Sequence, residues 1–272
     1  MATIVILEHR LQREAGLPYL VYALAERWRA QGHKVLVHHG LDDAPPGDLA
    51  VNNIELTEVP EAYRALFARY PKVVNGAVLD ISKARFSQDL VSRHDAWDGP
   101  VIVKTARNFG GKPEQLLRSI AARHGLPCDD ILSGPVADGY PVYRSAGEVP
   151  PLAWTTPGLL VEKFIPEQDE RGYYLRTWLF FGDRETSARW RATVPIIKAD
   201  DLLERENVPV PDELRAWRVR LGFDFGKFDY VRHGGRFALL DANRTPSFVP
   251  AIGARSAQLP DILAAGLDGF LA

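Results

Sequence analysis

Acidic and amide side chains with the spacing of a metal site occur near the C-terminal end of the chain. The segment Leu221–Pro246 contains two apolar runs, Phe225–Val231 and Phe237–Asp241, separated by a His-Gly-Gly sequence, and this pattern predicts a β-hairpin. Because side chains alternate between the two faces of a strand, Asp241 and Asn243 are expected on one face of the second predicted strand.

Asp229 is expected to join that face from the first predicted strand. A three-residue loop at Gly234–Arg236 would place Asp229 directly opposite Asp241. Two adjacent carboxylates repel each other unless a cation offsets their charge, and hard oxygen ligands suit Mg²⁺ better than Zn²⁺. The pattern therefore favours a magnesium site. The same Asp-x-Asn before Thr-Pro is also typical of a turn, and a different loop length would direct Asp229 away.

A glycine pair between a strand and a helix is a candidate phosphate site. Val101–Lys104 is a predicted strand that leads into TARNFGGKPE, and Pro113–His124 is a predicted helix closed by Gly125. Gly110 and Gly111 would leave backbone amides open to a phosphate. The loop is not a Walker A motif, because it lacks the first glycine and the Ser or Thr after the lysine. A double glycine is also common in ordinary turns.

Charged residues interrupt two apolar strands. The predicted strand Leu159–Ile165 carries Glu162 and Lys163 in its middle, and the predicted strand Tyr173–Phe181 carries Arg176. Charges in buried strands are costly unless they are paired or used in function. Two interpretations stay open: these residues form a structural salt bridge, or they serve a site.

Further cations stand at the ends of predicted elements. Lys83 falls in the first turn of a helix predicted over Ser82–Val91, where a cation is mildly disfavoured unless an anion lies nearby. Lys198 ends the predicted strand Val194–Lys198, and Arg244 follows the Asp-x-Asn motif. These cations would bind a substrate carboxylate or lie exposed, which is the commoner position for such residues.

The first 75 residues or so predict a small α/β domain. Thr3–Leu7 and Lys34–His38 have strand patterns, and the helical pattern of Leu17–Arg29 lies between them, so together they predict a βαβ unit and a parallel sheet. The dinucleotide-binding glycine fingerprint is missing from the loop after the first strand. The other expected elements are the strands Leu49–Leu56 and Lys72–Asn75 and the helices Pro60–Tyr70, Pro211–Leu221 and Leu259–Leu271.

Composition narrows the class of protein. The chain has 272 residues, of which 46% are hydrophobic and 25% are charged, and this is typical of one large or two modest globular domains. A formal net charge of −2 argues against a general binder of nucleic acid or of membrane surfaces. The single cysteine, Cys128, allows no internal disulfide. With no signal-like segment and no apolar run of membrane length, we expect a cytoplasmic protein.

The order of these motifs resembles that of the ATP-grasp superfamily, which includes D-alanine:D-alanine ligase, glutathione synthetase and the ligase that adds glutamate to a ribosomal protein. The order is Lys83, the VIVKTARNFGG strand and loop, LLVEKFIPE, the strand with Arg176, and the hairpin with Asp229, Asp241 and Asn243. The resemblance covers roughly residues 75–250. It implies an α/β (α+β) fold: a pre-ATP-grasp domain at 1–75 and a two-lobed ATP-grasp domain at 76–272, with lobes at about 92–162 and 163–272.

The resemblance also assigns roles to individual residues. Lys83 and Lys104 look like the lysines that hold the ATP phosphates. Asp229, Asp241 and Asn243 look like ligands of Mg²⁺, or of Mn²⁺ in its place. Catalytic cations would be Arg176, which would steady the transferred phosphate, together with Lys198 and Arg244. The remaining expected contacts to ATP are the loop residues Asn108, Gly110 and Gly111, the adenine-binding linker residues Glu162, Lys163, Phe164 and Ile165, and a ribose-binding acid at Asp169 or Glu170.

The implied function is an ATP- and Mg-dependent carboxylate–amine ligase. ATP would phosphorylate a substrate carboxylate, and an amine or similar nucleophile on a small molecule or peptide would displace the phosphate. Three departures from the family pattern are visible: Asp241 stands where Glu is usual, the glycine loop is sparse, and the segment between Lys83 and Lys104 is short for the superfamily. Two alternatives therefore accompany the ligase: a kinase-like phosphotransferase and a non-catalytic nucleotide-binding regulator. The resemblance allows a homodimer.

Overall fold

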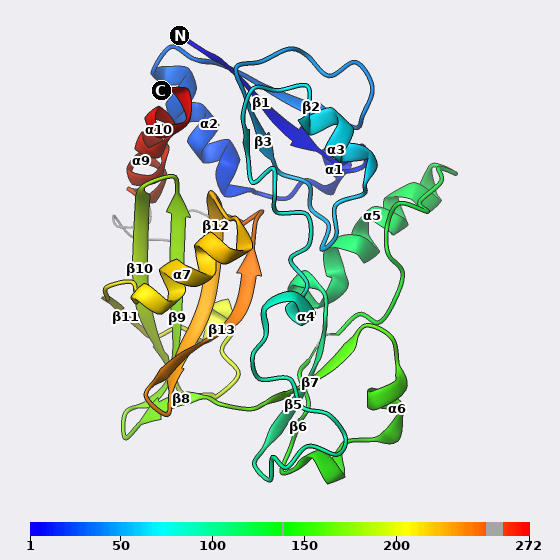
Figure 1. The fold of residues 1–272 in the computed structure, drawn as a ribbon, viewed down its shortest axis with the longest axis vertical. Coiled ribbons are helices and arrows are strands. Elements are labelled where there is room, and N and C mark those ends of the chain that lie inside the picture. The colour runs from blue at the N-terminus through cyan, green and yellow to red at the C-terminus, as the bar shows by residue number, and fades with distance from the viewer. Residues whose placement is uncertain (138, 249–257) are drawn as a thin grey trace.

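Three β-sheets organise the computed structural model, which describes residues 1–137, 139–248 and 258–272 (Figure 1). A four-stranded sheet occupies the N-terminal part of the chain, a three-stranded sheet the middle and a six-stranded sheet the C-terminal part. The mixed α/β class that the sequence predicts is confirmed. Within the described residues, no helix combines the length and the apolar character that crossing a membrane requires.

The first sheet has the strand order β2-β1-β3-β4, and all its strand pairs are parallel. Alternating side chains of β1 face two different cores. One core contains residues of α2, and the other contains residues of α3 together with α5 from the middle of the chain. The bounds are β1 Thr3–Glu8, α1 Gln12–Ala15, α2 Leu20–Ala30, β2 Lys34–His39, β3 Leu49–Asn52, α3 Ala62–Phe67 and β4 Val73–Val74.

The middle sheet is small and antiparallel, with the order β6-β5-β7. Its strand β5 leads into a 3-10 helix, η1, and then into the helix α5, which confirms the strand, glycine loop and helix expected there. The bounds are α4 Lys83–Phe86, β5 Val101–Thr105, η1 Asn108–Gly111, α5 Lys112–Arg123, β6 Val142–Tyr143, η2 Ala146–Glu148, α6 Pro151–Thr155 and β7 Leu159–Lys163.

The third sheet is antiparallel, has the order β11-β10-β9-β12-β13, and carries β8 beside β9. The helix α7 packs on one of its faces through Leu214 and Trp217, which join the aromatic core of β9 and β12. The bounds are β8 Glu167–Asp169, β9 Gly172–Phe181, β10 Arg184–Ala192, η3 Ala199–Asp201, β11 Glu204–Asn207, α7 Asp212–Leu221, β12 Phe225–His233 and β13 Arg236–Asn243.

The C-terminal helices return to the N-terminal domain (Figure 1). They are α9 Leu259–Ala264, η4 Ala265–Leu267 and α10 Asp268–Leu271, so the single closing helix predicted there is interrupted. The indole of Trp28 on α2 donates a hydrogen bond of 3.1 Å to the carbonyl of Ala264. Phe181 and Phe225 of the large sheet belong to the same buried core. The first sheet and the large sheet therefore share a core.

Two local predictions are wrong, and one strand was not predicted. The helix expected over Ser82–Val91 ends at Phe86, because the chain then runs extended along β7, where the amide of Val91 donates to Val161. Residues 194–198 form no strand. The strand β10 was missed because its sequence, RETSARWRA, is largely polar and lacks the apolar alternation of a half-buried strand.

Candidate functional site

Asp229 and Asp241 are opposite each other in the hairpin, as the sequence predicts, but the loop length and the strand register that bring them together differ from the predicted ones. The loop has two residues, because His233 pairs with Arg236. A two-residue loop alone would put Leu240 opposite Asp229. The register shifts by one residue next to Asp229, so that Leu240 is the extra residue of a β-bulge and Asp241 takes the paired position. The expected three-residue loop is therefore wrong, whereas the carboxylate pair is confirmed.

Lys227 is a site residue that the sequence analysis missed. It pairs with Asn243 across the hairpin and shares a face of β12 with Asp229, two positions further along. Its ammonium group lies 2.8 Å from Oδ2 of Asp229. The sequence did contain a signal for Lys227: side chains two positions apart on a strand share a face, so Lys227 could have been placed beside Asp229. Its other neighbours in this part of the sequence are mostly apolar.

Lys83 meets the second carboxylate from a different element. The short helix α4 buries Lys83 and places its Nζ 3.0 Å from Oδ1 of Asp241. The same ammonium group donates a hydrogen bond of 2.9 Å to the carbonyl of Arg107, just before the glycine loop. The anion that would explain a lysine in the first turn of a helix is therefore Asp241.

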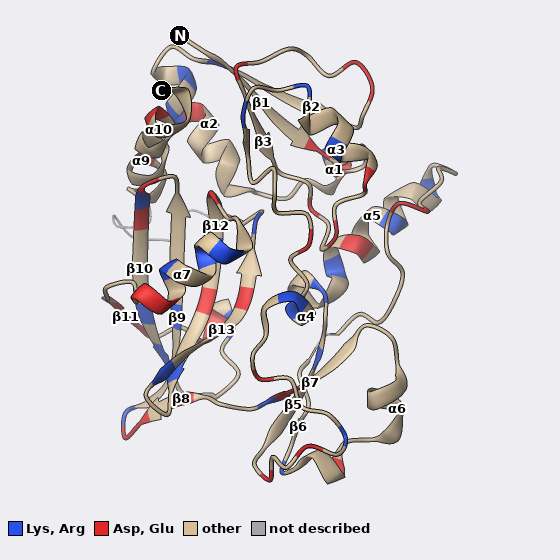
Figure 2. Cartoon of the chain, in the orientation of Figure 1, with Lys and Arg blue, Asp and Glu red and all other residues tan. Residues whose placement is uncertain are grey.

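Lys104 and Glu162 form a third ion pair, within the middle sheet. The Nζ of Lys104 on β5 lies 2.7 Å from Oε2 of Glu162 on β7, and both side chains are nearly buried. Figure 2 shows acidic segments side by side on β12 and β13 and basic segments on α4 and β5. Ion pairs from the hairpin, from α4 and from the middle sheet thus lie near one another, between the middle sheet and the large sheet.

The pKa values of the two aspartates are shifted in opposite directions. Burial raises the pKa of Asp229, and the charge of Asp241 adds to that effect, although Lys227 opposes it. Burial would also raise the pKa of Asp241, but Lys83 and Lys227 outweigh it and leave the pKa below its usual value. Lys104 acts on the pKa of Asp241 in the same direction, which places the middle sheet in electrostatic contact with the hairpin.

The donor set of the hairpin fits a hard divalent cation. Oδ1 of Asp229 is buried and has no hydrogen-bond partner in the described part of the chain, which is costly for a carboxylate oxygen unless a cation meets it. Asn243 lies two positions after Asp241 on the same strand, opposite Lys227, and its Oδ1 accepts hydrogen bonds from the amide and hydroxyl of Thr245. No group of three His, Cys, Asp or Glu side chains suited to a metal occurs among the described residues, so Asn243 must complete any site here.

The glycine loop has a conformation that needs glycine. Gly110 and Gly111 have φ values of 70° and 80°, in the left-handed region. A Cβ on Gly110 would lie 2.7 Å from the carbonyl oxygen of Ala137, whose own amide donates to the carbonyl of Gly110. The amide of Asn108, at the start of the loop, donates to the hydroxyl of Thr57. The loop is thus held between the first domain and residues 133–137.

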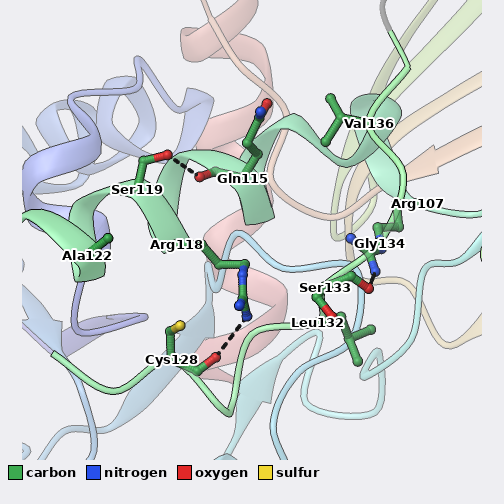
Figure 3. A pocket seen from close by; sticks show the side chains of 10 residues that line it. All are labelled: Arg107, Gln115, Arg118, Ser119, Ala122, Cys128, Leu132, Ser133, Gly134 and Val136. Carbon is green, nitrogen blue, oxygen red and sulfur yellow. Dashed lines mark hydrogen bonds between the residues drawn. The ribbon is translucent and has the colours of Figure 1, made fainter.

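Arginines fasten the segment that covers the glycine loop (Figure 3). Arg107 donates to the carbonyl of Ser133, and Arg118 on α5 donates to the carbonyls of Cys128 and Ile131. A cavity of about 480 Å³ lies between α5 and this segment. Among the described residues, neither Asp229 nor Asp241 lines this cavity, so it is separate from the carboxylate pair.

The segment from Glu162 to Ile165 connects the middle sheet to the large sheet, as its predicted role as a linker requires. The amide of Lys163 donates to Asp89, and that of Phe164 donates to Pro100. A cavity of about 700 Å³ opens beside this linker. Its walls come from both lobes and include Val142 and Tyr143 of β6, Phe164, Gln168 of β8, Tyr173 of β9 and His233 of the hairpin turn.

Arg176 is not brought to the carboxylate pair. In the antiparallel pairing of β9 with β12, Arg176 lies opposite Tyr230, whereas Asp229 lies opposite Thr177. Neighbouring positions of a strand point to opposite faces, so Arg176 is on the face that α7 covers. There its guanidinium makes two hydrogen bonds of 2.8 Å to the carboxylate of Glu167. In this structure Arg176 forms an ion pair with Glu167, and its expected role in steadying a transferred phosphate stays a prediction.

Arg244 and Lys198 are the other two expected catalytic cations. Arg244 is fully buried, and its guanidinium donates to the backbone carbonyls of Ile54, Leu56 and Val78 in the first domain. A side chain enclosed in this way holds two parts of the chain together, and its catalytic role stays a prediction. Lys198 is exposed in the segment between β10 and η3.

The two candidates for the ribose-binding acid are at the β8–β9 turn. Asp169 accepts hydrogen bonds of 2.8 Å from the hydroxyl of Tyr174 and from the amide of Arg171. Glu170 is exposed in the turn itself. The choice between them stays a prediction.

No protein-family model and no curated protein sequence matches this chain. Solved structures do match over nearly the whole chain. An ATP-grasp ligase associated with ribosomally synthesised peptides, from Chryseobacterium gregarium, has a TM-score of 0.57 at 10% identity and covers 99% of this chain and 97% of its own. That structure contains ADP, a leader peptide and a core peptide.

Two further structures have the same arrangement. A macrocyclase from Microcystis aeruginosa, bound to its precursor peptide, has a TM-score of 0.54 at 11% identity, with 96% of this chain and 98% of that chain covered. D-alanine–D-alanine ligase from Bacillus anthracis has a TM-score of 0.51 at 11% identity, with 100% and 96% covered. At identities this low, the structural similarity shows a common fold and nothing more specific.

Proposed function

This chain has the ATP-grasp fold, and from that premise we propose that it is an ATP-dependent ligase. In the proposed reaction, ATP phosphorylates a substrate carboxylate to an acyl phosphate, and an amine displaces the phosphate to form an amide, leaving ADP and inorganic phosphate. The observation that carries the proposal is the meeting of three lysine–carboxylate pairs between the lobes.

Those pairs supply what phosphoryl transfer needs from a protein. The reaction requires little covalent help, but it requires positioning and neutralisation of negative charge. Lys83, Lys104 and Lys227 each hold a carboxylate that they can exchange for a phosphate oxygen. Because the lysines come from α4, β5 and β12, a triphosphate that binds all three would also join the two lobes.

The hairpin would hold the magnesium ion. Asp229, Asp241 and Asn243 offer oxygen ligands on one face, and the unpartnered Oδ1 of Asp229 supports this assignment. The bound ion would neutralise charge on the phosphates that ATP brings. Mn²⁺ accepts the same ligands. With the carboxylates on the cation, Lys83 and Lys227 become free to contact phosphate.

The nucleotide base would lie at the linker. The cavity of about 700 Å³ there is bordered by both lobes and by the aromatic side chains of Phe164, Tyr143 and Tyr173, which suit a planar base. Glu162, Lys163 and Ile165 would contribute backbone groups to the adenine edge. Asp169 or Glu170 would accept hydrogen bonds from the ribose.

The acceptor is a carboxylate on a small molecule or a peptide. Peptide substrates are supported by the two structural neighbours from Chryseobacterium gregarium and Microcystis aeruginosa, which are bound to peptides. The D-alanine–D-alanine ligase neighbour supports a small-molecule substrate equally well. The fold is common to all three, so substrate identity follows from the pocket of each protein.

Thermal unfolding with nucleotide tests the proposal. A ligand that binds only the folded state must raise the melting temperature by mass action. We expect Mg-ATP to stabilise the wild type more than ATP in excess EDTA, and Asp229→Asn together with Asp241→Asn to abolish the difference. Asp183→Asn is the matched control, since Asp183 is an exposed acid of the large sheet. A Mg-ATP response that survives in the double variant would contradict the metal assignment.

The products distinguish a ligase from a kinase on this fold. A ligase releases phosphate and ADP only when both a carboxylate and an amine are present, whereas a phosphotransferase leaves a stable phosphorylated product. Mass spectrometry after incubation with candidate peptides and with ¹⁸O-labelled carboxylates separates these outcomes. Transfer of ¹⁸O from the carboxylate to inorganic phosphate is the expected result for an acyl phosphate.

A further inference from the structure

The cavity between α5 and residues 128–136 is lined by two arginines (Figure 3). Arg107 precedes the glycine loop and is only 8% exposed, and Arg118 on α5 is half-buried. Among the side chains that Figure 3 draws around the cavity, these two are the charged ones. The cavity has a volume of about 480 Å³, and its lining carries positive charge.

Neither Arg107 nor Arg118 forms an ion pair with an acidic side chain in the described part of the chain. Their guanidinium groups donate instead to backbone carbonyls of the segment that covers the glycine loop. Burial raises the pKa of Glu58 and the charge of Arg107 opposes that effect, yet no ion pair joins these two described side chains. A buried guanidinium is costly unless an anion neutralises it, so the two arginines indicate a place for one.

Two glycines make room for the side chain of Arg107. A Cβ on Gly134 would lie 2.5 Å from Nη2 of Arg107, and a Cβ on Gly111 would lie 3.3 Å from its Cδ. Larger residues at these positions would therefore push the guanidinium out of the cavity wall. Because the arginine is already enclosed in this position, a ligand would not have to order it, and this preorganisation favours binding.

The other lining residues indicate what the rest of the ligand is like. A guanidinium presents its N–H donors in a planar fork that matches the oxygens of a carboxylate or a phosphate. Leu132 and Val136, which are 42% and 36% exposed, border the same cavity and suit a carbon skeleton. A volume of about 480 Å³ is in the range of small-molecule sites. A small organic anion fits this lining.

The cavity adjoins the support of the phosphate-binding elements. The backbone carbonyl of Arg107 accepts a hydrogen bond of 2.9 Å from Nζ of Lys83. The residue after Arg107, Asn108, begins the glycine loop. A ligand that holds the side chain of Arg107 would thus contact the backbone that positions Lys83, without entering the predicted metal site.

We propose that this cavity is a second ligand site, which binds a small organic anion through a carboxylate or phosphate group held by Arg107 and Arg118. The site is distinct from the proposed metal and base sites, because neither Asp229 nor Phe164 lines it. The inference goes beyond the proposed ligase function and does not depend on it.

The thiol of Cys128 provides a local test. Cys128 is the single cysteine of the chain, and it lines the cavity. The measurement is its rate of alkylation by uncharged iodoacetamide in sodium succinate, sodium phosphate or sodium chloride, at equal ionic strength and fixed pH. We expect succinate or phosphate to slow alkylation up to a plateau, because the bound anion covers the thiol, and chloride to have no such effect. The anion that protects at the lower concentration identifies the preferred acid group.

Two arginines of the same helix give a matched pair of variants. Arg118→Gln should raise the concentration needed for half-maximal protection about tenfold or more, since a charge-assisted hydrogen bond to the anion is lost. Arg123→Gln changes an exposed arginine at the end of α5 and should retain the wild-type value. Each variant is compared with its own rate in chloride. Protection should persist with saturating Mg-ATP, because the nucleotide binds elsewhere.

Three results would overturn the anion site: no protection by either anion in the wild type, equal protection in Arg118→Gln, or loss of the protection when Mg-ATP is added. None of them affects the proposed ligase, which the Mg-ATP response of the melting temperature tests separately. If Arg118→Gln fails to fold, Arg118→Lys decides, because it keeps the charge and loses the planar fork.

Thermal unfolding replaces alkylation if Cys128 does not react in the folded protein. Succinate and phosphate stabilise folded proteins in general, so the informative quantity is the part of the rise in melting temperature that Arg118→Gln loses and Arg123→Gln keeps. An equal rise in both variants would overturn the site.

Discussion

At the scale of single residues, the candidate site consists of lysines paired with aspartates. Lys83 and Lys227 approach the carboxylate pair from two different elements, and each contacts one aspartate. Without them, two buried carboxylates on neighbouring strands would repel each other and take up a proton. The lysines therefore keep the hairpin charged and ready for a cation.

Lys227→Met should weaken Mg-ATP binding. The substitution leaves Oδ2 of Asp229 without its partner, so the pKa of Asp229 rises further and the carboxylate is a poorer metal ligand. Loss of one charge-assisted hydrogen bond predicts binding about tenfold weaker or more. Calorimetric titration at pH 7 measures it, and Lys227→Arg is the matched control. Equal affinity in Lys227→Met and the wild type would show that Lys227 contributes nothing to the site.

At the scale of elements, the positions of the site residues depend on small irregularities. The bulge at Leu240 shifts by one residue the register that the two-residue turn sets, so that the two aspartates lie opposite each other. The glycine loop turns through three consecutive left-handed residues, Phe109, Gly110 and Gly111, and Gly110 packs closely against the carbonyl of Ala137. Each irregularity occurs where an element reaches the site, which is where backbone strain is often found in functional proteins.

Gly110→Ala should destabilise the protein more than Gly125→Ala. Both glycines have positive φ, but a Cβ on Gly125 meets no atom within 4 Å, whereas one on Gly110 would be 2.7 Å from a carbonyl oxygen. The shared backbone strain costs about 1 kcal/mol in each variant. The clash should add about 2 kcal/mol for Gly110→Ala. Urea unfolding of both variants measures the difference, and equal losses would refute the close packing of this loop.

Arg244→Met should unfold more easily. The fully buried guanidinium satisfies carbonyls of Ile54, Leu56 and Val78, and methionine would leave them without a donor. The expected loss is about 3 kcal/mol in the free energy of unfolding. Arg27→Met, which breaks an exposed pair with Asp261, should cost less than about 1 kcal/mol. Denaturant titration compares them, and a loss in Arg244→Met no larger than in Arg27→Met would contradict a clamping role.

At the scale of the whole molecule, the N-terminal and C-terminal parts of the chain pack against each other. The helices α9 and α10 pack near α2, and Arg244 ties the end of the hairpin to the first domain. Buried carboxylates gather along this junction, and burial raises the pKa values of Glu8 and Glu55. The stability of the molecule should therefore depend on pH between the acidic range and neutrality.

Stability should fall as pH rises from 5 to 8, and Glu55→Gln should reduce that fall. The pKa of Glu55 is about 7 in the folded state and 4.5 as its ordinary value, so the folded state binds more protons within this window. The free energy of unfolding then decreases with rising pH, by about 3 kcal/mol at most for this group. Arg244, Glu114, Tyr19 and Thr245 set its surroundings. Chemical unfolding at pH 5 and 8 measures it, and identical pH dependence in both proteins would refute the shift.

Elements with strong local patterns were predictable. The alternating or helical spacing of apolar residues indicated β1, α2, α5 and the β12–β13 hairpin, and the order of charged motifs led to the ATP-grasp fold. The pair of Asp229 and Asp241 followed from period-2 geometry, even though the turn was assigned the wrong length. The strand β10 was not predicted, because its pairing with neighbouring strands, and not its own sequence, makes it a strand.

The sequence by itself determined the order of the lysines, glycines and oxygen ligands along the chain. It also determined the helices and strands that carry them, because the spacing of apolar residues within each element indicates its type. The tertiary structure decided which face each residue uses and what it meets. Arg176 was directed to Glu167 by the pairing of β9 with β12, and Arg244 was enclosed by the first domain. Such partners are distant in sequence, and only the packing of sheets brings them together, so no local pattern could indicate them.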